Sequence, residues 1–328
     1  MKFSVLIPLY NKAPYIRETL GSVLAQTCTD FEIIVIDDGS SDGSADIVEA
    51  LAVPGLRLVR QANAGVSAAR NRGIALARGQ WVAFLDGDDL YHPAHLAGLL
   101  AAQQACPQAD MVGTDYLPVP DRREMWPPAW PDTAGKEVEP RVEVISDLPR
   151  RWMRAPSLCT SSVAIRTTRL QEMQPCFAPG ESHGEDLDLF FRVGEISPIA
   201  LTRTPLVAYR VAVRGSLTAH NPVLAMPPFL QRMHARALSG ALSGPQRRSS
   251  LWLVAQYQVS LARDAIAHGK RRAGLNWLLQ GCRAATSKRW WVTAAMALFF
   301  PGQLVRGWQH WRLRRITQAA DTGGRHDF

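Results

Sequence analysis

Four short apolar runs, separated by stretches with a helical pattern, dominate the first 90 residues. The runs begin near residues 3, 31, 56 and 81, and the stretches 14–26, 45–51 and 68–77 between them read as helices. Continuous apolar runs of this length are typical of strands that are buried on both faces. Strands that alternate with helices at this spacing predict an α/β fold, with a mixed, mostly parallel sheet flanked by helices.

Three of the predicted strands end in polar residues. Tyr10-Asn11 follows the first strand, Asp37-Asp38 the second, and Asp86-Gly87-Asp88-Asp89 the fourth. Ligands of open parallel sheets bind outside the carboxyl ends of the strands, so these groups predict a site at that edge. Crowded carboxylates attract a cation, and oxygen ligands suit Mg²⁺ or Mn²⁺, which often holds phosphates. Taken alone, the last cluster has the alternative of a solvated acidic turn.

Five motifs follow one another along the chain. They are Ser4–Asn11, Val35–Ser44, Asn63–Gly73, Phe84–Asp89 and Gly184–Arg192. In this order they resemble glycosyltransferase family 2, which has the GT-A (Rossmann-like) fold; the match is strong over about residues 3–115 and patchier to about 220. The resemblance implies a GT-A catalytic domain over 1–225, with a nucleotide-sugar half (1–115) and an acceptor half (116–225), followed by a tail over 226–328.

The resemblance assigns donor-binding roles to residues from each of the first four motifs. These residues are Pro8, Tyr10, Asp38, Gly65, Arg70, Asp86 and Asp88. It implies that the Tyr10 ring lies against the nucleobase and that Asp38 accepts a hydrogen bond from a base N–H, which favours uracil. Arg70 would contact the nucleotide and Asp86 the ribose. Asp88 would bind the metal cofactor, Mn²⁺ or Mg²⁺, directly.

These assignments have structural alternatives. Tyr10 could instead pack on the adjacent helix, and Gly65 could be an ordinary loop glycine rather than a point of close approach to a ligand. Arg70 could form a salt bridge with a nearby carboxylate. We expect Asp37 to act as a cap or turn partner, and Asp89 could start the next helix.

The fifth motif carries the predicted catalytic base. Gly184-Glu185-Asp186 is expected to begin a helix, where carboxylates interact favourably with the helix dipole, so ordinary capping is the alternative function. The resemblance assigns the base to Asp186. It would deprotonate an acceptor hydroxyl during an inverting transfer, while the metal stabilises the leaving nucleoside diphosphate. Asp188 and Arg192 are expected to support this helix.

The segment between these motifs is less regular. Residues 116 to about 145 contain six prolines and predict a loop-rich insertion, in which Trp126 and Trp130 could stack on a sugar or simply anchor the loop. Residues 157–165 are strand-like. Further on, Arg210 resembles a basic residue that can face the diphosphate, but Val211-Ala212 stands where a histidine is often expected, which weakens that role for Arg210 and His220.

Other chemistries find little support. The sequence has no Gly-x-Gly-x-x-Gly after the first strand, no phosphate loop and no Gly-x-Ser-x-Gly elbow. His92 and His95 lack a third nitrogen or sulfur ligand nearby and are expected at the surface or at a helix start. The five cysteines lack pairing or metal spacing, which favours a reduced, cytoplasmic setting, and the first strand starts at once, so no signal peptide is expected.

Charge is distributed unevenly. Residues 231–328 hold 16 Lys or Arg against 3 Asp or Glu, a net charge of +13 in a chain of net +8, and six of the ten tryptophans. Helical patterns cover 251–268 and 273–282, and the apolar run 290–300 is shorter than the ~20 residues that span a bilayer. Basic flanks and tryptophans predict a helical extension that lies on an anionic membrane. A helical cap packed on the catalytic domain is the alternative; nucleic-acid binding lacks a supporting motif.

The predicted function is inverting, metal-dependent transfer of a sugar from a nucleoside diphosphate donor, expected to be UDP-linked. The acceptor would be a hydroxyl of a glycan or lipid-linked molecule in cell-surface polysaccharide synthesis. The protein would lie in the cytoplasm, peripherally on the inner face of the cell membrane. Two alternatives stay open: an inactive glycan-binding or assembly protein with the same fold, and a nucleotidyltransferase that would release pyrophosphate.

Overall fold

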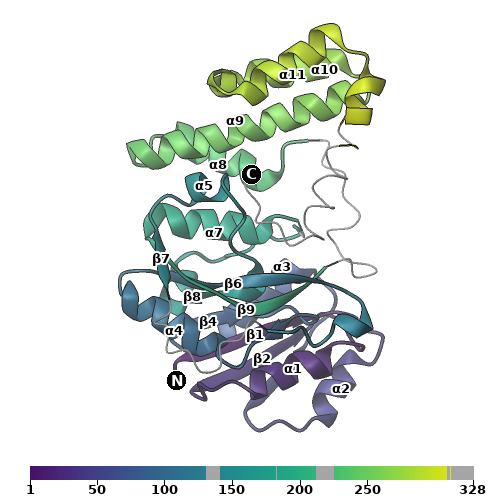
Figure 1. The fold of residues 1–328 in the computed structure, drawn as a ribbon. Coiled ribbons are helices and arrows are strands. Elements are labelled where there is room, and N and C mark those ends of the chain that lie inside the picture. Colours follow the sequence, from purple (N-terminus) through teal and green to yellow (C-terminus); the bar gives the residue numbers. More distant parts are fainter. Residues whose placement is uncertain (131–140, 182, 212–224, 309–310, 312–328) are drawn as a thin grey trace. The chain divides into compact units, whose positions relative to one another are not determined.

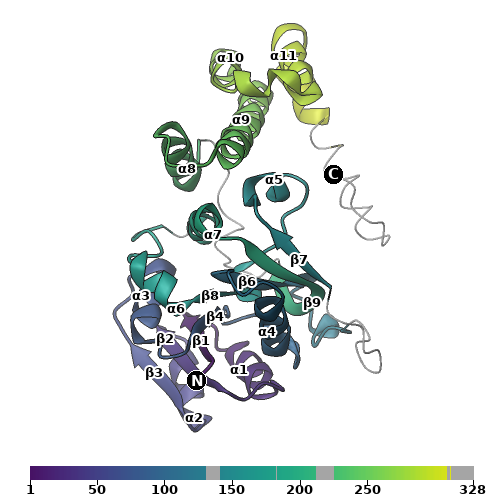
Figure 2. The same ribbon diagram turned by 90° about the vertical axis from the view of Figure 1, so that its left-hand side faces the viewer.

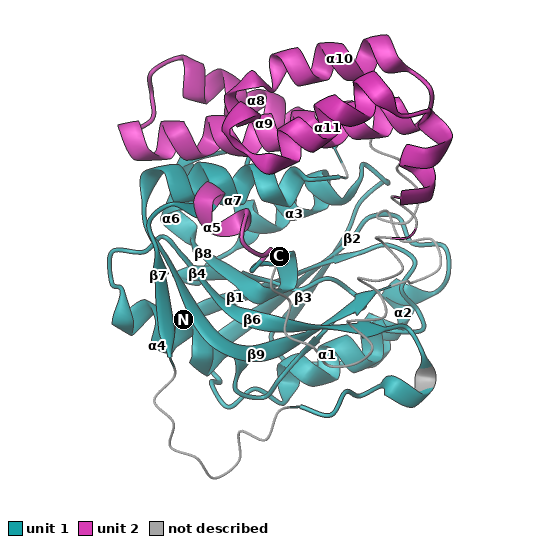
Figure 3. Cartoon of the chain, turned by 45° about the horizontal axis from the view of Figure 1, so that its top comes forward, with its two compact units in different colours: residues 1–148, 157–220 teal, residues 149–156, 221–328 magenta. Residues whose placement is uncertain are grey.

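The chain forms two compact units. The computed structural model describes residues 1–130, 141–181, 183–211, 225–308 and 311. A sheet unit comprises residues 1–148 and 157–220, and a helical unit comprises residues 149–156 and 221–328 (Figure 3). The boundary predicted from the sequence, after residue 225, lies five residues beyond the boundary between the two units at residues 220 and 221.

The sheet unit is built on a nine-stranded mixed sheet. Its order is β3-β2-β1-β4-β8-β6-β9-β5, and β7 pairs with β9 (Figure 1). The strands are β1 Phe3–Leu9, β2 Phe31–Asp37, β3 Leu56–Arg60, β4 Trp81–Phe84, β5 Leu90–Tyr91, β6 Met111–Pro120, β7 Val142–Ile145, β8 Val163–Arg166 and β9 Ile199–Val211. The first four are parallel neighbours, and β6 and β9 are also parallel. The predicted mixed, mostly parallel α/β sheet is confirmed.

Helices cover both faces of this sheet, which explains the uniformly apolar strands. Helices α1 (Ile16–Leu24) and α4 (His95–Ala105) lie on one face, while α3 (Val66–Leu76), α6 (Thr167–Glu172) and α7 (Glu185–Ile196) lie on the other (Figure 2). The remaining helix before β3 is α2 (Ser44–Ala50). Central strand residues such as Leu6 and Ile34 are fully buried as a result.

Three local expectations are wrong. The predicted insertion begins with strand, because β6 continues to Pro120 and pairs with β9 over its whole length. The segment 157–165 is only partly strand: η2 (Thr160–Ser162), a 3₁₀ turn, precedes β8. Asp89 does not start a helix, since it leads into β5 and the next helix begins at His95. His95 does begin α4, but it is fully buried rather than at the surface.

The helical unit is organised around one long helix. Helix α9 (Gly244–Ala267) contacts α8 (Pro228–Leu238), α10 (Arg271–Gln280), η4 (Cys282–Thr286) and α11 (Lys288–Phe299). Its core is made of small and branched side chains, including Val259, Ala262 and Ile266. The other short helical segments are α5 (Leu148–Trp152) and, in the sheet unit, η1 (Arg123–Met125). In the described part of the chain, no helix combines the length and the apolar character needed to cross a bilayer.

Candidate active site

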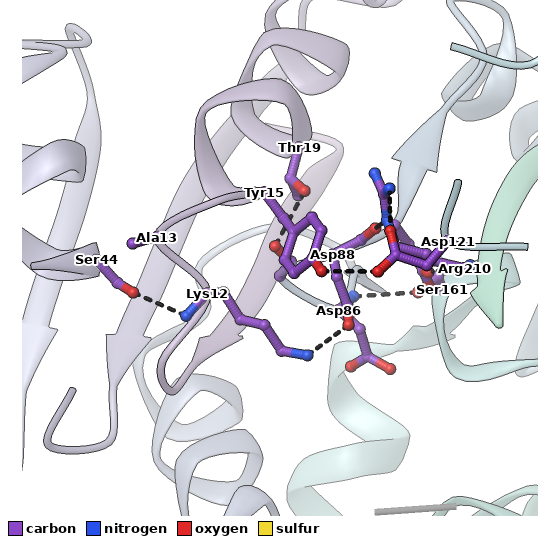
Figure 4. A network of polar contacts seen from close by, with 12 residues as sticks. Lys12, Ala13, Tyr15, Thr19, Ser44, Asp86, Asp88, Asp121, Ser161 and Arg210 are labelled. Atoms are coloured by element: carbon purple, nitrogen blue, oxygen red, sulfur yellow. Dashed lines mark hydrogen bonds and ion pairs between the residues drawn. The ribbon is translucent and has the colours of Figure 1, made fainter. Parts of the chain in front are cut away.

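The polar strand ends gather at one edge of the sheet, as the sequence predicts. β1, β2 and β4 run parallel and in register, so the residues that follow Leu9, Asp37 and Phe84 emerge at the same edge. The loops are tied together: the backbone N–H of Lys12 donates to the Ser44 hydroxyl at 2.8 Å (Figure 4). This edge therefore holds every donor-binding residue that the resemblance assigns to the first strands.

Tyr10 and Pro8 lie at the end of β1. Tyr10 exposes 49% of its surface, whereas Pro8 is partly buried within the strand. A ring that is half exposed can stack on a planar ligand with its open face. The contact with a nucleobase stays a prediction.

Asp38 organises the loop in front of α3. Its carboxylate accepts hydrogen bonds from Gln61 Nε2 at 2.7 Å and from the backbone N–H groups of Ala64 and Gly65 at 2.9 and 2.8 Å. Position 65 has a φ of +88°, a backbone conformation that favours glycine. An added Cβ would meet no atom within 4 Å, so the conformation and not crowding explains the glycine. Asp37 accepts from the N–H of Ser40 at 3.2 Å, which is the expected turn contact. Recognition of a base by Asp38 stays a prediction.

Arg70 joins two motifs that lie more than a hundred residues apart. From α3, its guanidinium donates to Asp86 at 2.8 Å and to Glu185 at 2.7 Å, while only 3% of the residue is exposed. Burial opposes its charge, but the two carboxylates outweigh burial and raise the pKa of Arg70 above its ordinary value. The salt-bridge alternative is therefore present in this structure, and the predicted nucleotide contact stays a prediction.

The acidic turn after β4 carries three carboxylates in different surroundings. Asp88 forms an ion pair with the ammonium of Lys12 (Figure 4). Burial raises the pKa of Asp88, and the Lys12 charge only partly offsets this. Asp89 is 1% exposed and accepts from the Ser161 hydroxyl at 2.5 Å; burial, together with Asp88 and Asp86, raises its pKa well above the usual value. The three carboxylates of this turn are therefore balanced differently: Asp86 pairs with Arg70 and Asp88 with Lys12, whereas Asp89 is buried against a hydroxyl and a backbone N–H.

The predicted base lies directly beside the residue that Arg70 binds. Asp186 is half-buried in the first turn of α7 and accepts a hydrogen bond from the Thr160 hydroxyl at 3.0 Å. The pKa of Glu185 is raised, because burial and the neighbouring Asp186 outweigh the opposing effect of Arg70. Asp188 pairs with Arg192 at 3.1 Å, in the supporting arrangement expected for this helix. Asp186 is thus the carboxylate of this helix start that forms no ion pair in the described part of the chain.

Arg210 lies buried beside the acidic turn. It is 7% exposed, and its guanidinium lies over the rings of Trp126 and Tyr15, 3.5 and 4.6 Å from their centroids. Its Nε donates to the backbone carbonyl of Asp88 at 2.8 Å, and Nη1 donates to Asp121 at 3.0 Å. Arg210 thus contacts the backbone of the acidic turn, and its predicted contact with a diphosphate stays a prediction; His220 lies outside the described residues.

The two tryptophans of the insertion act as anchors. Trp126 donates its Nε1–H to the Pro120 carbonyl at 2.9 Å and contacts Arg210, and Trp130 meets the His92 ring edge-on at 5.1 Å. Both belong to a small apolar cluster around Leu90. The anchoring alternative therefore describes them better than an open sugar-stacking platform.

Sequence reasoning missed the residues that hold the carboxylates. Thr160 contacts Asp186. Lys12 contacts Asp88, Tyr15 and Asp121 contact Arg210, and Ser161 accepts from the backbone N–H of Asp86 at 3.1 Å (Figure 4). Lys12 follows the first motif directly, so it had a usable signal. Tyr15 lies in the predicted helix 14–26, and the other three lie in segments read as insertion or strand, where the sequence offers no local signal for their contacts.

Asp86 and Asp88 suit a metal ion whose remaining ligands are supplied by substrate phosphates and water. Among the described residues, no group of three or more His, Cys, Asp or Glu side chains could hold a metal by itself. Asp88 Oδ1 and Asp86 Oδ2 accept no hydrogen bond from the described residues. Magnesium typically keeps waters and uses one or two carboxylates plus substrate phosphates, which matches this donor set.

Comparison with known proteins identifies the N-terminal region. The sequence model of "Glycosyl transferase family 2" matches residues 4–156. The chain carries a glycosyltransferase family 2 domain. The first four motifs lie within the match, which confirms the predicted family; the fifth, Gly184–Arg192, lies beyond residue 156.

Relatives of this family 2 domain match only in part of their length. The uncharacterized glycosyltransferase EpsJ of Bacillus subtilis is 41% identical over 128 residues, 38% of this chain and 37% of EpsJ. The uncharacterized glycosyltransferase alr2836 of Nostoc sp. is 36% identical over 179 residues, 53% of this chain and 54% of alr2836. The chain thus spans about half or less of the length of these relatives.

The fold of the whole chain has a solved counterpart. The crystal structure of S. aureus TarS 1–349 in complex with UDP-GlcNAc superposes with a TM-score of 0.67 over 94% of this chain and 92% of that chain, at 20% identity. This likeness establishes the GT-A fold for the family 2 domain and a shared architecture that extends into the C-terminal helical region.

Proposed function

We propose that the protein is an inverting, metal-dependent glycosyltransferase that uses a nucleoside diphosphate sugar, most simply a UDP-sugar. The main supporting observation is that Arg70 donates to both Asp86 and Glu185, which brings the acidic turn close to the start of α7, where Asp186 lies. The UDP-GlcNAc in the TarS crystal structure supports a nucleotide-sugar donor. The acceptor would be a hydroxyl of a glycan or lipid-linked molecule in cell-surface polysaccharide synthesis.

The donor would lie along the carboxyl edge of the sheet. The exposed Tyr10 ring would stack on the base, with the loop held by Asp38 and Gly65 beneath the nucleoside. Mn²⁺ or Mg²⁺, held by Asp88 with Asp86 nearby, would neutralise the diphosphate as it leaves. Lys12, which pairs with Asp88 in this structure, would be a second positive group beside the phosphates.

Asp186 would act as the general base. It would take the proton of the acceptor hydroxyl as that oxygen bonds to the anomeric carbon from the face opposite the phosphate. The bond between the anomeric carbon and the phosphate oxygen would break, and its electron pair would leave with the nucleoside diphosphate. Thr160, which donates to Oδ2 of Asp186, would orient the carboxylate, and Arg70 would hold Glu185 away from this role.

Product analysis tests this function against its alternatives. The full chain is incubated with UDP-GlcNAc, UDP-glucose and UDP-galactose in the presence of Mn²⁺, with and without sugar acceptors. Release of UDP, with inverted anomeric configuration in the product, supports the proposal. Release of pyrophosphate from a sugar phosphate and a nucleoside triphosphate would indicate a nucleotidyltransferase. Donor or glycan binding without any turnover would indicate an assembly protein.

The metal assignment has its own test. In Asp88→Asn the ion loses a charged ligand, so we expect donor binding to lose its dependence on Mn²⁺. Isothermal titration calorimetry with UDP-GlcNAc, with and without Mn²⁺, measures this. Asp110→Asn is a matched control, because Asp110 pairs with Arg166 and Arg169 in a separate cluster. Unchanged metal-dependent affinity in Asp88→Asn would move the metal site elsewhere.

We also propose that the helical unit associates with an anionic membrane surface, which would place the protein peripherally on the inner face of the cell membrane. Large apolar side chains are exposed on several helical segments of this unit: Leu275, Leu279, Trp291, Leu298, Phe299 and Leu304. Leu275 and Leu279 are four residues apart and Trp291 and Leu298 seven apart, so each pair shares one helix face. Exposed apolar residues on a strongly basic unit favour a membrane interface. Sedimentation with anionic vesicles tests this proposal.

A further inference from the structure

A second candidate site lies wholly within the helical unit. A pocket of about 600 Å³ is lined by the start of α9 and by η4. Its lining residues are Gly244, Arg247, Arg248, Leu251, Trp252 and Arg283. Three arginines and a tryptophan thus face one cavity whose volume falls in the range of small-molecule sites.

The pocket depends on a close approach between two distant segments. Arg283 on η4 reaches the pocket because Gly281, just before it, packs against α9. A side chain at Gly281 would meet the Ala255 carbonyl and Gln258 Cβ, each at 3.2 Å. Glycine therefore lets η4 lie close enough to bring Arg283 beside Arg247 and Arg248, more than 30 residues away in sequence.

The three arginines have no acidic partner among the residues of this unit that the structure describes. None of Arg247, Arg248 and Arg283 forms an ion pair or hydrogen bond with a side chain in the described part of the chain. Asp264 is the only acidic residue between 225 and 308, and it lies about 20 Å along α9 from Leu251 at the usual helical rise. Three like charges around one cavity repel each other, and a bound anion would relieve that repulsion.

We propose that this pocket binds a phosphate group attached to a ring or chain that rests on Trp252 and Leu251. Guanidinium groups bind phosphate oxygens through paired hydrogen bonds, and the positive end of the 24-residue helix α9 adds to their field. The tryptophan and leucine supply the apolar wall that a free inorganic ion would not need. The phosphate has two possible sources: a soluble phosphorylated molecule or a phospholipid headgroup.

Fluorine NMR tests the site directly. The full chain is labelled with 5-fluorotryptophan, and the Trp252 resonance is identified by its loss in Trp252→Phe. Inorganic pyrophosphate is titrated at constant ionic strength with EDTA present, which suppresses metal-dependent binding elsewhere. We expect a saturable shift of the Trp252 resonance. Arg247→Ala and Arg283→Ala should each weaken the apparent affinity about tenfold, the usual value for one charge-assisted contact.

The controls separate a site from general charge. Arg272→Ala removes an exposed arginine on α10, outside the pocket, and should leave the titration unchanged. Unaltered resonances of the other tryptophans show that each variant is folded. No shift of Trp252, or an unchanged midpoint in both Arg247→Ala and Arg283→Ala, would overturn the proposal.

Bicelles distinguish the two phosphate sources. If bicelles that contain phosphatidylglycerol shift the Trp252 resonance and pyrophosphate competes with them, the pocket takes a lipid phosphate. If only pyrophosphate shifts the resonance, the pocket takes a soluble phosphorylated ligand. A shift with bicelles but none with pyrophosphate would make Trp252 a general membrane contact and would contradict a phosphate site.

Discussion

The two units of this chain treat charge in opposite ways. In the sheet unit, a buried arginine such as Arg70 is paired with two carboxylates, and Arg210 is paired with Asp121. In the helical unit, the pocket arginines Arg247, Arg248 and Arg283 form no ion pair with any residue that the structure describes. Charge in the sheet unit is used to position groups, whereas charge in the helical unit is available for an external anion.

Under the two proposals, the chemistry and the partner contacts would lie in separate parts of the chain. The sheet unit holds its reactive carboxylates with internal cations, so their geometry is set before a donor arrives. The helical unit exposes large apolar side chains beside basic ones, and exposed apolar patches often mark interaction surfaces. The predictions below test whether the two units differ in this way.

The largest effect is expected at Asp186. Asp186→Asn should reduce turnover by about 10²–10⁴, the usual contribution of a positioned general base, while donor affinity stays nearly unchanged. Steady-state kinetics together with calorimetry for the donor measure the two quantities. Asp188→Asn is the matched control on the same helix, because Asp188 is paired with Arg192. Full activity of Asp186→Asn would move the base, with Glu185 the next candidate.

Arg70 tests whether internal pairing holds the sheet unit together. Arg70→Met leaves Asp86 and the buried Glu185 without their cation, so we expect a loss of about 3 kcal/mol in the free energy of unfolding. Arg247→Met in the helical unit removes an exposed arginine and should change stability by less than about 0.5 kcal/mol. Urea denaturation of both variants gives the comparison. Equal effects would show that the two units do not differ in their use of charge.

The sequence predicts the strands that position this site better than the contacts between its side chains. Strands β1 to β4 are predictable because each is an apolar run buried on both faces, and parallel strands deliver their last residues to one edge. The pairing of Arg70 with Glu185 is not predictable, because it joins residues 115 positions apart whose proximity depends on the packing of α3 and α7. Arg210 lay in a recognisable position, but its burial against Trp126 depends on a loop without a sequence pattern.

The pocket of the helical unit was equally hidden. A basic, tryptophan-containing tail predicts affinity for anions in general. The convergence of Arg247, Arg248 and Arg283 depends on Gly281 letting η4 approach α9, and the sequence alone does not show which helix turn a single glycine will face. Tertiary packing therefore decides which arginines act together.

A smaller effect concerns pH and the interior of the sheet unit. His95 is fully buried beside Tyr91 and Thr114, and burial, with a smaller effect of His92, lowers its pKa to about 3. Because the unfolded chain binds a proton near pH 6.5 and the folded chain does not, His95 lowers stability as pH falls below that value.

His95→Gln should remove about 2 kcal/mol of the stability difference between pH 7 and pH 5. Denaturation at the two pH values, in both proteins, measures this. The raised pKa values of Asp89 and Glu185 act in the opposite direction, since these groups gain protons on folding, but they are common to both proteins and cancel. His268→Gln is the control in the helical unit, because that ring is exposed. An unchanged pH dependence in His95→Gln would mean that His95 is protonated in the folded state.

The smallest effects are expected on the exposed apolar face of the helical unit. The full chain should sediment with anionic vesicles and be partly released at high salt, because each basic residue near such a surface contributes about 1 kcal/mol that salt screens. Truncation before about Ser287 should remove binding. Trp291→Ser and Leu298→Ser, at positions 63% and 60% exposed, should each weaken the salt-resistant part by about 1 kcal/mol. Ile196→Ser is the matched control, since Ile196 is 57% exposed but belongs to the sheet unit and should not affect binding. If all three variants bind alike, or if the full chain ignores anionic vesicles at low salt, the apolar face is not a membrane contact and the argument for a lipid-linked acceptor loses its main support.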